Sequence, residues 1–193
     1  MSAQELASTL LGRLKENSGF DEHRPYIGMS RIGECRKRIY TEFIDGVAAT
    51  LDNHVGAWLG YTMEAAVLEL LGKDVQPGRE LTAFDGLVRG HTDGEWRGEL
   101  IEVKSTTNRK LLERLDDRRV DDRHYQQVTA YMHFGRWRRC SVIYVPRDFG
   151  KPTVFGVNYD PNEGARIEAR FAEIVTHVRN KRPPRCECGR CRN

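Results

Sequence analysis

Two short segments in the middle of the chain carry the residue types of a metal-dependent hydrolase. The first is Gly90-His-Thr-Asp93 and the second is Glu102-Val103-Lys104. Because side chains alternate along a strand, Glu102 and Lys104 are expected on one face, about 6.5 to 7 Å apart. Glycines between the two segments permit a tight hairpin. Such a hairpin places Asp93 beside Glu102.

Two carboxylates beside a lysine are suited to phosphodiester hydrolysis. Mg²⁺ and Mn²⁺ prefer oxygen ligands and keep several waters, which leaves room for a substrate phosphate. The ion stabilises charge on the phosphate and acidifies water, while an ammonium group orients that water or neutralises the transition state. A lone Glu-x-Lys is also typical of a surface ion pair. The prediction therefore depends on the upstream aspartate and the glycine-rich turns.

A third acid, Glu64, lies on the apolar face of a helix expected from about residue 53 to 71, with Gly72 closing it. Its neighbours on that face are all apolar or small, namely Ala57, Gly60, Tyr61, Val67, Leu68 and Leu71. Burying a carboxylate there is unfavourable without a cation or hydrogen-bond donors. Three interpretations are open: a salt bridge to an arginine, a helix less buried than its sequence indicates, and a third metal ligand.

Gln127 and Tyr131 are four residues apart on a second helix, and therefore share a face. An amide and a phenol placed there can hydrogen-bond a DNA phosphate or hold Lys104 in position. The same spacing is common in amphipathic helices whose tyrosine is half-buried. The pair is a candidate for the site only because the strand motifs accompany it.

The order of the elements predicts a mixed α/β domain with a central sheet. Further helices are expected at residues 6–17, from Ser30 as N-cap to about 44 with Gly46 beyond the end, at 123–134 and at 162–179. Expected strands are short runs joined at glycines between 80 and 106, followed by 141–145 and 153–157. The charged stretch 108–122 is expected to form a helix and a loop.

Composition excludes a membrane-spanning protein, because no apolar run approaches the roughly 20 residues that cross a bilayer. The N-terminal sequence has no basic region followed by an apolar stretch, so we expect that it is not a secretory signal. A cytosolic protein is therefore expected, and its cysteines should be reduced thiols. The net charge of +3 says little, but residues 161–193 hold eight Lys or Arg against four Glu. Such a basic segment either contacts phosphates or is a solvated face.

Taken together, the motifs resemble those of the PD-(D/E)XK nuclease superfamily, with Asp93 as the signature aspartate and Glu102-Val103-Lys104 as D/E-x-K. More narrowly, the chain is similar to the RecB-like exonucleases, including their cysteine-containing CRISPR-associated branch and phage relatives. Their Gly-x-x-Asp and Gln-x-x-x-Tyr motifs correspond to residues 90–93 and 127–131. Their early Gly-x-x-x-His has glutamate in the histidine position here, at Glu64, as in several other branches.

This resemblance implies a restriction-endonuclease-like core, with a central mixed sheet flanked by helices. It implies one nuclease domain over 1–193: a helical N-terminal region to residue 50, a core at 53–160, and a C-terminal helix and tail at 161–193. The implied metal ligands are Glu64, Asp93, Glu102 and the carbonyl of Val103, for Mg²⁺ or Mn²⁺, with Lys104 positioning the attacking water.

The implied activity is exonucleolytic hydrolysis at DNA ends or in single strands, in a bacterial cell or a phage-infected host. Two rivals are an inactive DNA-binding or adaptor protein with this fold and a restriction-type endonuclease. The chain lacks a Gly-x-x-x-x-Gly-Lys-Ser/Thr phosphate loop, so any unwinding is expected from a helicase, recombination or adaptation partner. The oligomeric state does not follow from the sequence.

Three of the five cysteines, Cys186, Cys188 and Cys191, lie within six residues, which predicts a metal or cluster site. In the cysteine-containing branch a [4Fe–4S] cluster takes one cysteine before the core and three after it, so the resemblance adds Cys35. Four thiolates also suit a structural zinc, which stays open because the Cys-x-Cys-x-x-Cys spacing is tight. Cys140, at the start of an expected strand, is predicted to be a core thiol.

Overall fold

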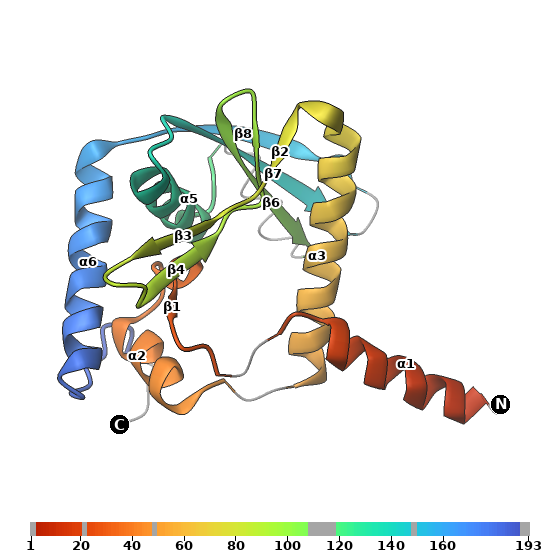
Figure 1. The fold of residues 1–193 in the computed structure, drawn as a ribbon, viewed down its shortest axis with the longest axis horizontal. Coiled ribbons are helices and arrows are strands. Elements are labelled where there is room, and N and C mark those ends of the chain that lie inside the picture. Colours follow the sequence, from red (N-terminus) through yellow and green to blue (C-terminus); the bar gives the residue numbers. More distant parts are fainter. Residues whose placement is uncertain (1–2, 21–22, 48–49, 108–118, 148–149, 190–193) are drawn as a thin grey trace.

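The computed structural model describes residues 3–20, 23–47, 50–107, 119–147 and 150–189. Two sheets form the centre of the molecule (Figure 1). The larger has the order β2-β5-β6-β7-β8, with bounds Val75–Pro77, Gly94–Trp96, Glu99–Thr106, Arg139–Pro146 and Thr153–Asn158. The smaller has the order β1-β4-β3, with bounds Ile27–Gly28, Val88–His91 and Glu80–Ala83.

The larger sheet is mixed, as the family resemblance implied. Strands β6 and β7 run parallel, whereas the β2–β5, β5–β6 and β7–β8 pairs are antiparallel. Residues Asp122–Gly135 form α5, which begins in the segment between β6 and β7. A parallel pair needs such a crossover, and a crossover places a helix on the face of the sheet. The predicted architecture of a mixed central sheet flanked by helices is confirmed.

Side chains alternate along β6, so apolar residues of this strand face both sides of the sheet, and helices cover both sides. On one face Ile101 and Val103 pack against α3 (Leu51–Leu71) through Val67 and Leu68. On the other face Leu100 joins the main core with α5 and α6 (Pro161–Arg179). Figure 1 shows α3 on one side of the strands and α6 on the other. The strand that carries Glu102 and Lys104 therefore lies in the interior of the molecule.

The hairpin of β5 and β6 forms as expected. Its turn residues, Arg97 and Gly98, both have positive φ, at 53° and 83°, which is the backbone conformation of a two-residue hairpin turn matching the strand twist. The register pairs Gly94 with Ile101. The next position back along β5 is Asp93, which consequently lies beside Glu102.

The described residues of the N-terminal third include the α-helices α1 (Ala3–Asn17), α2 (Arg36–Asp45) and the greater part of α3. Helix α1 projects from the body of the molecule (Figure 1). Thr50 caps α3 by accepting a hydrogen bond from the Asn53 amide, and Gly72, with φ of 77°, ends it as predicted.

The helix expected from Ser30 to about residue 44 is present and ends at Gly46 as predicted, but its predicted start at Ser30 is wrong. Met29–Arg31 forms a single 3₁₀ turn, and α2 begins only at Arg36. Arg170 of α6 supplies the physical reason, because its guanidinium donates to the carbonyls of Ile32, at 3.0 Å, and Glu34, at 2.7 Å. These carbonyls would otherwise accept the hydrogen bonds of a continuous helix.

Strands β1 and β2 were not expected from the sequence. Both are short, and β1 gains its partner only through a parallel contact with β4, which lies about 60 residues later. The helix and loop expected at 108–122 lie largely outside the described residues. Among the described helices, none is both long and apolar enough to cross a bilayer.

Candidate active site

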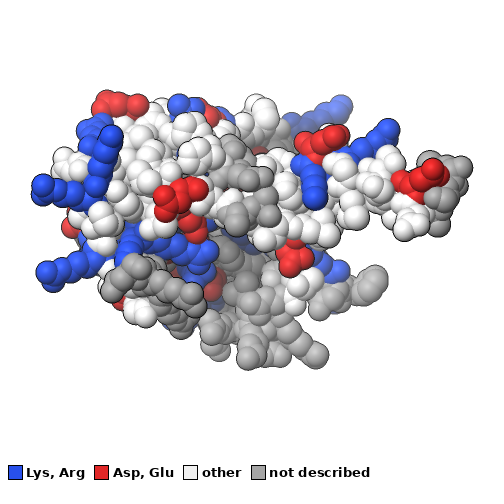
Figure 2. All heavy atoms as spheres, turned by 90° about the horizontal axis from the view of Figure 1, so that it is seen from below, with Lys and Arg blue, Asp and Glu red and all other residues white. Residues whose placement is uncertain are grey.

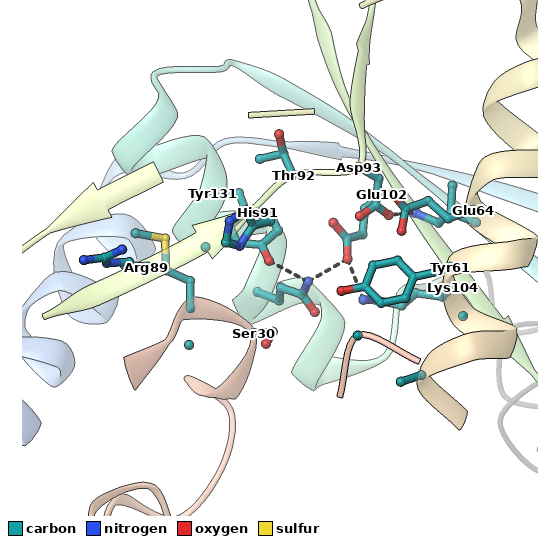
Figure 3. A pocket seen from close by; sticks show the side chains of 18 of the residues that line it. Ser30, Tyr61, Glu64, Arg89, His91, Thr92, Asp93, Glu102, Lys104 and Tyr131 are labelled. Atoms are coloured by element: carbon teal, nitrogen blue, oxygen red, sulfur yellow. Dashed lines mark hydrogen bonds and ion pairs between the residues drawn. The ribbon is translucent and has the colours of Figure 1, made fainter. Parts of the chain in front are cut away.

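The predicted acids and lysine all line one pocket of about 680 Å³. Glu64 enters it from α3, Asp93 from the β4–β5 link, and Glu102 and Lys104 from β6. Figure 3 shows the three carboxylates gathered on one side of the pocket with Lys104 below them. A helix and both sides of one hairpin therefore converge on the pocket, as the geometry of a metal site requires.

Asp93 is held by its backbone surroundings. Its Oδ2 accepts a hydrogen bond of 2.6 Å from the Val103 amide of β6. The preceding residue, Thr92, is buried and exchanges hydrogen bonds with Arg79. Gly78 makes this approach possible, because a Cβ there would lie 1.7 Å from the Thr92 carbonyl oxygen. The link between β2 and β3 thus fixes the position of Asp93.

Glu102 is the most deeply buried charged residue of the site, with 1% of its surface exposed. Its Oε1 accepts a hydrogen bond of 2.6 Å from Gln127 and lies 2.5 Å from the Lys104 ammonium. Its Oε2 is buried and has no hydrogen-bond partner among the described residues. A buried carboxylate oxygen without a donor is unfavourable unless another ligand meets it.

Gln127 and Tyr131 belong to the site through Glu102. The Gln127 amide bridges Glu102 and the Tyr131 hydroxyl, which it reaches at 3.1 Å. The Tyr131 ring packs on Gly90, where a Cβ would lie 2.6 Å from its Cε1. Position 90 must therefore be glycine, because any larger residue there would collide with the Tyr131 ring. The sequence left two roles open for the amide and the phenol, a hydrogen bond to a DNA phosphate and support of Lys104. In the structure the amide donates to Glu102, whose same oxygen also contacts Lys104.

Burial and neighbouring charges shift the pKa values of Asp93, Glu64 and Lys104. Burial, and then the charges of Glu102 and Glu64, raise the pKa of Asp93 well above its usual value. Burial, and then Glu102, raise the pKa of Glu64. Burial lowers the pKa of Lys104, but attraction to Glu102 and Asp93 outweighs it and the net shift is upward. The lysine remains protonated beside a site that carries too much negative charge.

Glu64 is half-buried, and within the described residues it makes no hydrogen bond or ion pair. Its helical neighbours divide into two groups. Val67 and Leu68 pack on the sheet, whereas Gly60 and Tyr61 line the pocket. The apolar face predicted from the sequence therefore extends only along the C-terminal half of α3. No arginine salt bridge to Glu64 is present in the described part of the chain.

The described donor set suits a hard divalent cation. It consists of carboxylate oxygens from Glu64, Asp93 and Glu102, with one oxygen of Glu102 buried and unpartnered. A cation bound among them would relieve the repulsion that raises the pKa of Asp93. Oxygen ligands of this kind are typical of Mg²⁺ and Mn²⁺ sites.

Three arginines in the pocket wall were missed from the sequence: Arg24, Arg89 and Arg147. Arg147 follows β7 and donates to Ser105 near the end of β6, at 2.8 Å. The carboxyl ends of parallel strands meet at one edge of a sheet, so knowledge of the β6–β7 pairing would have predicted that Arg147 lies near the site. Arg89 stacks over Tyr26, 5.4 Å from the ring centroid. No local pattern signals that contact.

The cysteines gather at a second place. The sulfur atoms of Cys35, Cys186 and Cys188 all lie within 4.8 Å of one another, so this group can hold a metal ion. Cys191, the fourth predicted ligand, lies outside the described residues. Cys140 is fully buried in the core, as predicted, and burial raises the pKa of its thiol.

Solved structures with a similar fold include exonucleases. An alkaline exonuclease from Laribacter hongkongensis superposes with a TM-score of 0.66 at 14% identity, over 81% of this chain and 89% of its own. SSO0001 gives 0.62 at 18% identity, over 96% and 93%. A phage-related exonuclease from Haemophilus somnus 129PT gives 0.55 at 12% identity, over 79% and 81%.

The chain has a restriction-endonuclease-like fold. This agrees with the superfamily that the motifs resemble. No protein-family model and no curated protein sequence matches the chain. The fold was therefore recognisable from a few spaced residues and from the structure, although the superposed structures share only 12–18% sequence identity with the chain.

The crowded carboxylates predict how stability depends on pH without metal. Asp93 titrates near 3.9 in an unfolded chain and at a higher pKa in the folded protein. The folded state therefore binds this proton more readily, and stability falls as the pH rises through the folded pKa. Asp93→Asn keeps an acceptor for the Val103 amide and removes the charge. In EDTA at pH 8 the Tm of this variant should be higher than that of the wild type, because the variant buries no charge beside Glu102 and Glu64. Each kcal/mol gained corresponds to about 2–4 °C in a chain of this size.

Thermal melts from pH 5 to 8 measure this effect, and the difference should shrink towards pH 5. Mn²⁺ should raise the Tm of the wild type but not that of the variant. Glu99→Gln is the matched control, because Glu99 begins β6, the strand of Glu102, but pairs with Arg139. An Asp93→Asn variant less stable than wild type at every pH in EDTA would contradict the crowding of the carboxylates.

Proposed function

We propose that this chain is a divalent-metal-dependent deoxyribonuclease that hydrolyses phosphodiester bonds, as an exonuclease on DNA ends or single strands. The observation that carries the proposal is the buried Oε2 of Glu102, which has no partner among the described residues, in a pocket that two further acids and a protonated lysine also line. Exonucleases among the structural neighbours support it, one of them solved with dAMP.

Each residue of the site has a role in this proposal. Glu64, Asp93, Glu102 and the carbonyl of Val103 would hold Mg²⁺ or Mn²⁺, which when bound supplies positive charge for the phosphate and acidifies water. The Lys104 ammonium, fixed by Glu102, would donate to the attacking water and to the charge that develops on the phosphate.

Gln127 and Tyr131 act as positioning residues in this scheme. The Gln127 amide donates a hydrogen bond to Oε1 of Glu102 and so leaves Oε2 available for a metal ion. Tyr131 holds that amide and packs on Gly90. The arginines of the wall, Arg24, Arg89 and Arg147, would attract the DNA backbone to the mouth of the pocket.

Linear DNA incubated with Mn²⁺ should be degraded, and EDTA should stop the reaction. Asp93→Ala and Lys104→Met should each lower the rate by at least about a hundredfold, because each removes charge used at the reacting phosphate. Lys73→Met, an exposed lysine outside the pocket, is the control for a lost positive charge. The measurement is the release of acid-soluble nucleotides from end-labelled DNA.

The same assay separates the rival functions. Covalently closed circular DNA should survive, since an exonuclease needs an end, and cutting of circles would indicate a restriction-type endonuclease instead. Wild-type protein that binds DNA but degrades none with Mg²⁺ or Mn²⁺ would favour the inactive adaptor. Undiminished degradation by Asp93→Ala or Lys104→Met would reject the assigned site.

We infer further that the cysteine group is a structural metal site, with Cys191 as the fourth ligand and a [4Fe–4S] cluster as its content. The three described sulfur atoms lie within 4.8 Å of one another and fit either a cluster or zinc. Such a site would tie residue 35 to a tail about 150 residues later, which stabilises the fold by several kcal/mol on loop-closure grounds. In this reading the chain belongs with the cysteine-containing RecB-like exonucleases.

Anaerobic purification tests the content of this site. Brown protein with about four iron and four sulfide per chain is expected for the cluster. Cys35→Ala should lose the iron, whereas Cys140→Ala should keep it, because Cys140 lies in the core. Stoichiometric zinc in a colourless sample would overturn the cluster and leave the structural site.

A further inference from the structure

The tail that carries Cys186 and Cys188 is held by ion pairs as well as by any metal. Glu187 lies between these two cysteines in the sequence and faces two arginines. Its Oε2 accepts a hydrogen bond of 3.0 Å from Arg170 of α6, and its Oε1 pairs with Arg36 at the start of α2. The residue between the two cysteines thus anchors the tail to two helices.

The same two arginines are bound to the segment of Cys35. Arg170 donates to the carbonyls of Ile32 and Glu34, immediately before Cys35. Arg36 follows Cys35 directly, and it also pairs with Glu173 of α6. One guanidinium therefore contacts both chain segments that bring cysteines to the site. Figure 2 shows Lys and Arg side chains gathered at this end of the molecule.

We propose that Arg36, Arg170 and Glu187 form an ion-pair cradle that seats the tail beside Cys35 before a metal is bound. Glu187 is then a positioning residue for the thiol site. The inference rests on the thiol site put forward under Proposed function, but the nuclease pocket takes no part in it.

The geometry of the cradle explains how a terminal segment finds its partner. A tail tethered only at the end of α6 samples many positions, and fixing it lowers its entropy. Bonds from Arg170 to main-chain carbonyls fix the arginine itself, so that the guanidinium presents a ready-made site to Glu187. Cys35, as N-cap of α2, lies at a helix end that favours a nearby thiolate. The metal would then meet thiols that are already close together.

Two measurements on full-length protein test the cradle, with Glu187→Gln as the variant. The first is amide hydrogen exchange of residues 185–189 in EDTA, where the wild type should be protected and the variant should exchange at least about tenfold faster. The second is titration with Co²⁺ alone, followed by thiolate–Co²⁺ absorption, where the variant should bind at least about tenfold more weakly. Glu187→Asp should restore part of both effects.

Glu163→Gln is the matched control, because it breaks an ion pair with Arg166 on α6 without touching the tail. Equal exchange rates for wild type and Glu187→Gln, or equal Co²⁺ affinities, would overturn the cradle. Degradation of DNA by Glu187→Gln should match that of the wild type, which separates the cradle from the nuclease assignment. Wild-type protein without thiolate–Co²⁺ absorption would contradict the thiol site, and the exchange rates then decide on the cradle alone.

Discussion

Burial of the Glu102 carboxylate is the constraint on which the rest of this structure depends. A charged group with 1% of its surface exposed is tolerated only when other groups replace water around it. Lys104 and Gln127 do this for one oxygen, whereas the other oxygen has no donor among the residues that the structure describes. A positive charge placed beside this carboxylate would therefore be strongly stabilised.

The fold can be understood as a means of meeting this constraint. The hairpin turn sets the register that brings Asp93 next to Glu102, and the parallel β6–β7 pair requires the crossover that contains α5. Helix α5, which packs on the face of the sheet that carries Leu100 and Glu102, then supplies Gln127. Helix α3 brings Glu64 from the other face of the sheet. Each layer of the domain contributes at least one group to the pocket.

Much of this site could be predicted because its determinants are local. The period of two along β6 predicts that Glu102 and Lys104 share a face, and glycine at the turn predicts the hairpin that brings Asp93 to them. Glu64 stands out because its helical neighbours carry no charge. These inferences use only spacing along one element, which backbone geometry fixes.

The errors arise where distant segments meet. Ser30 looks like a helix cap, but Arg170, some 140 residues later, takes the carbonyls that the helix would need. The Gln127–Glu102 contact and the arginines of the pocket wall depend on how layers pack, which spacing does not encode. The cysteine site is intermediate, since the three tail cysteines were visible as a group, while Cys35 was added only by resemblance.

The most direct test of the account is a crystal structure of the protein soaked in Mn²⁺ and recorded near the manganese absorption edge. The account places an anomalous peak among the carboxylates of Glu64, Asp93 and Glu102, within ligand distance of the now unpartnered Oε2. Carboxylates joined instead by shared protons or by an arginine, with no manganese between them, would contradict it.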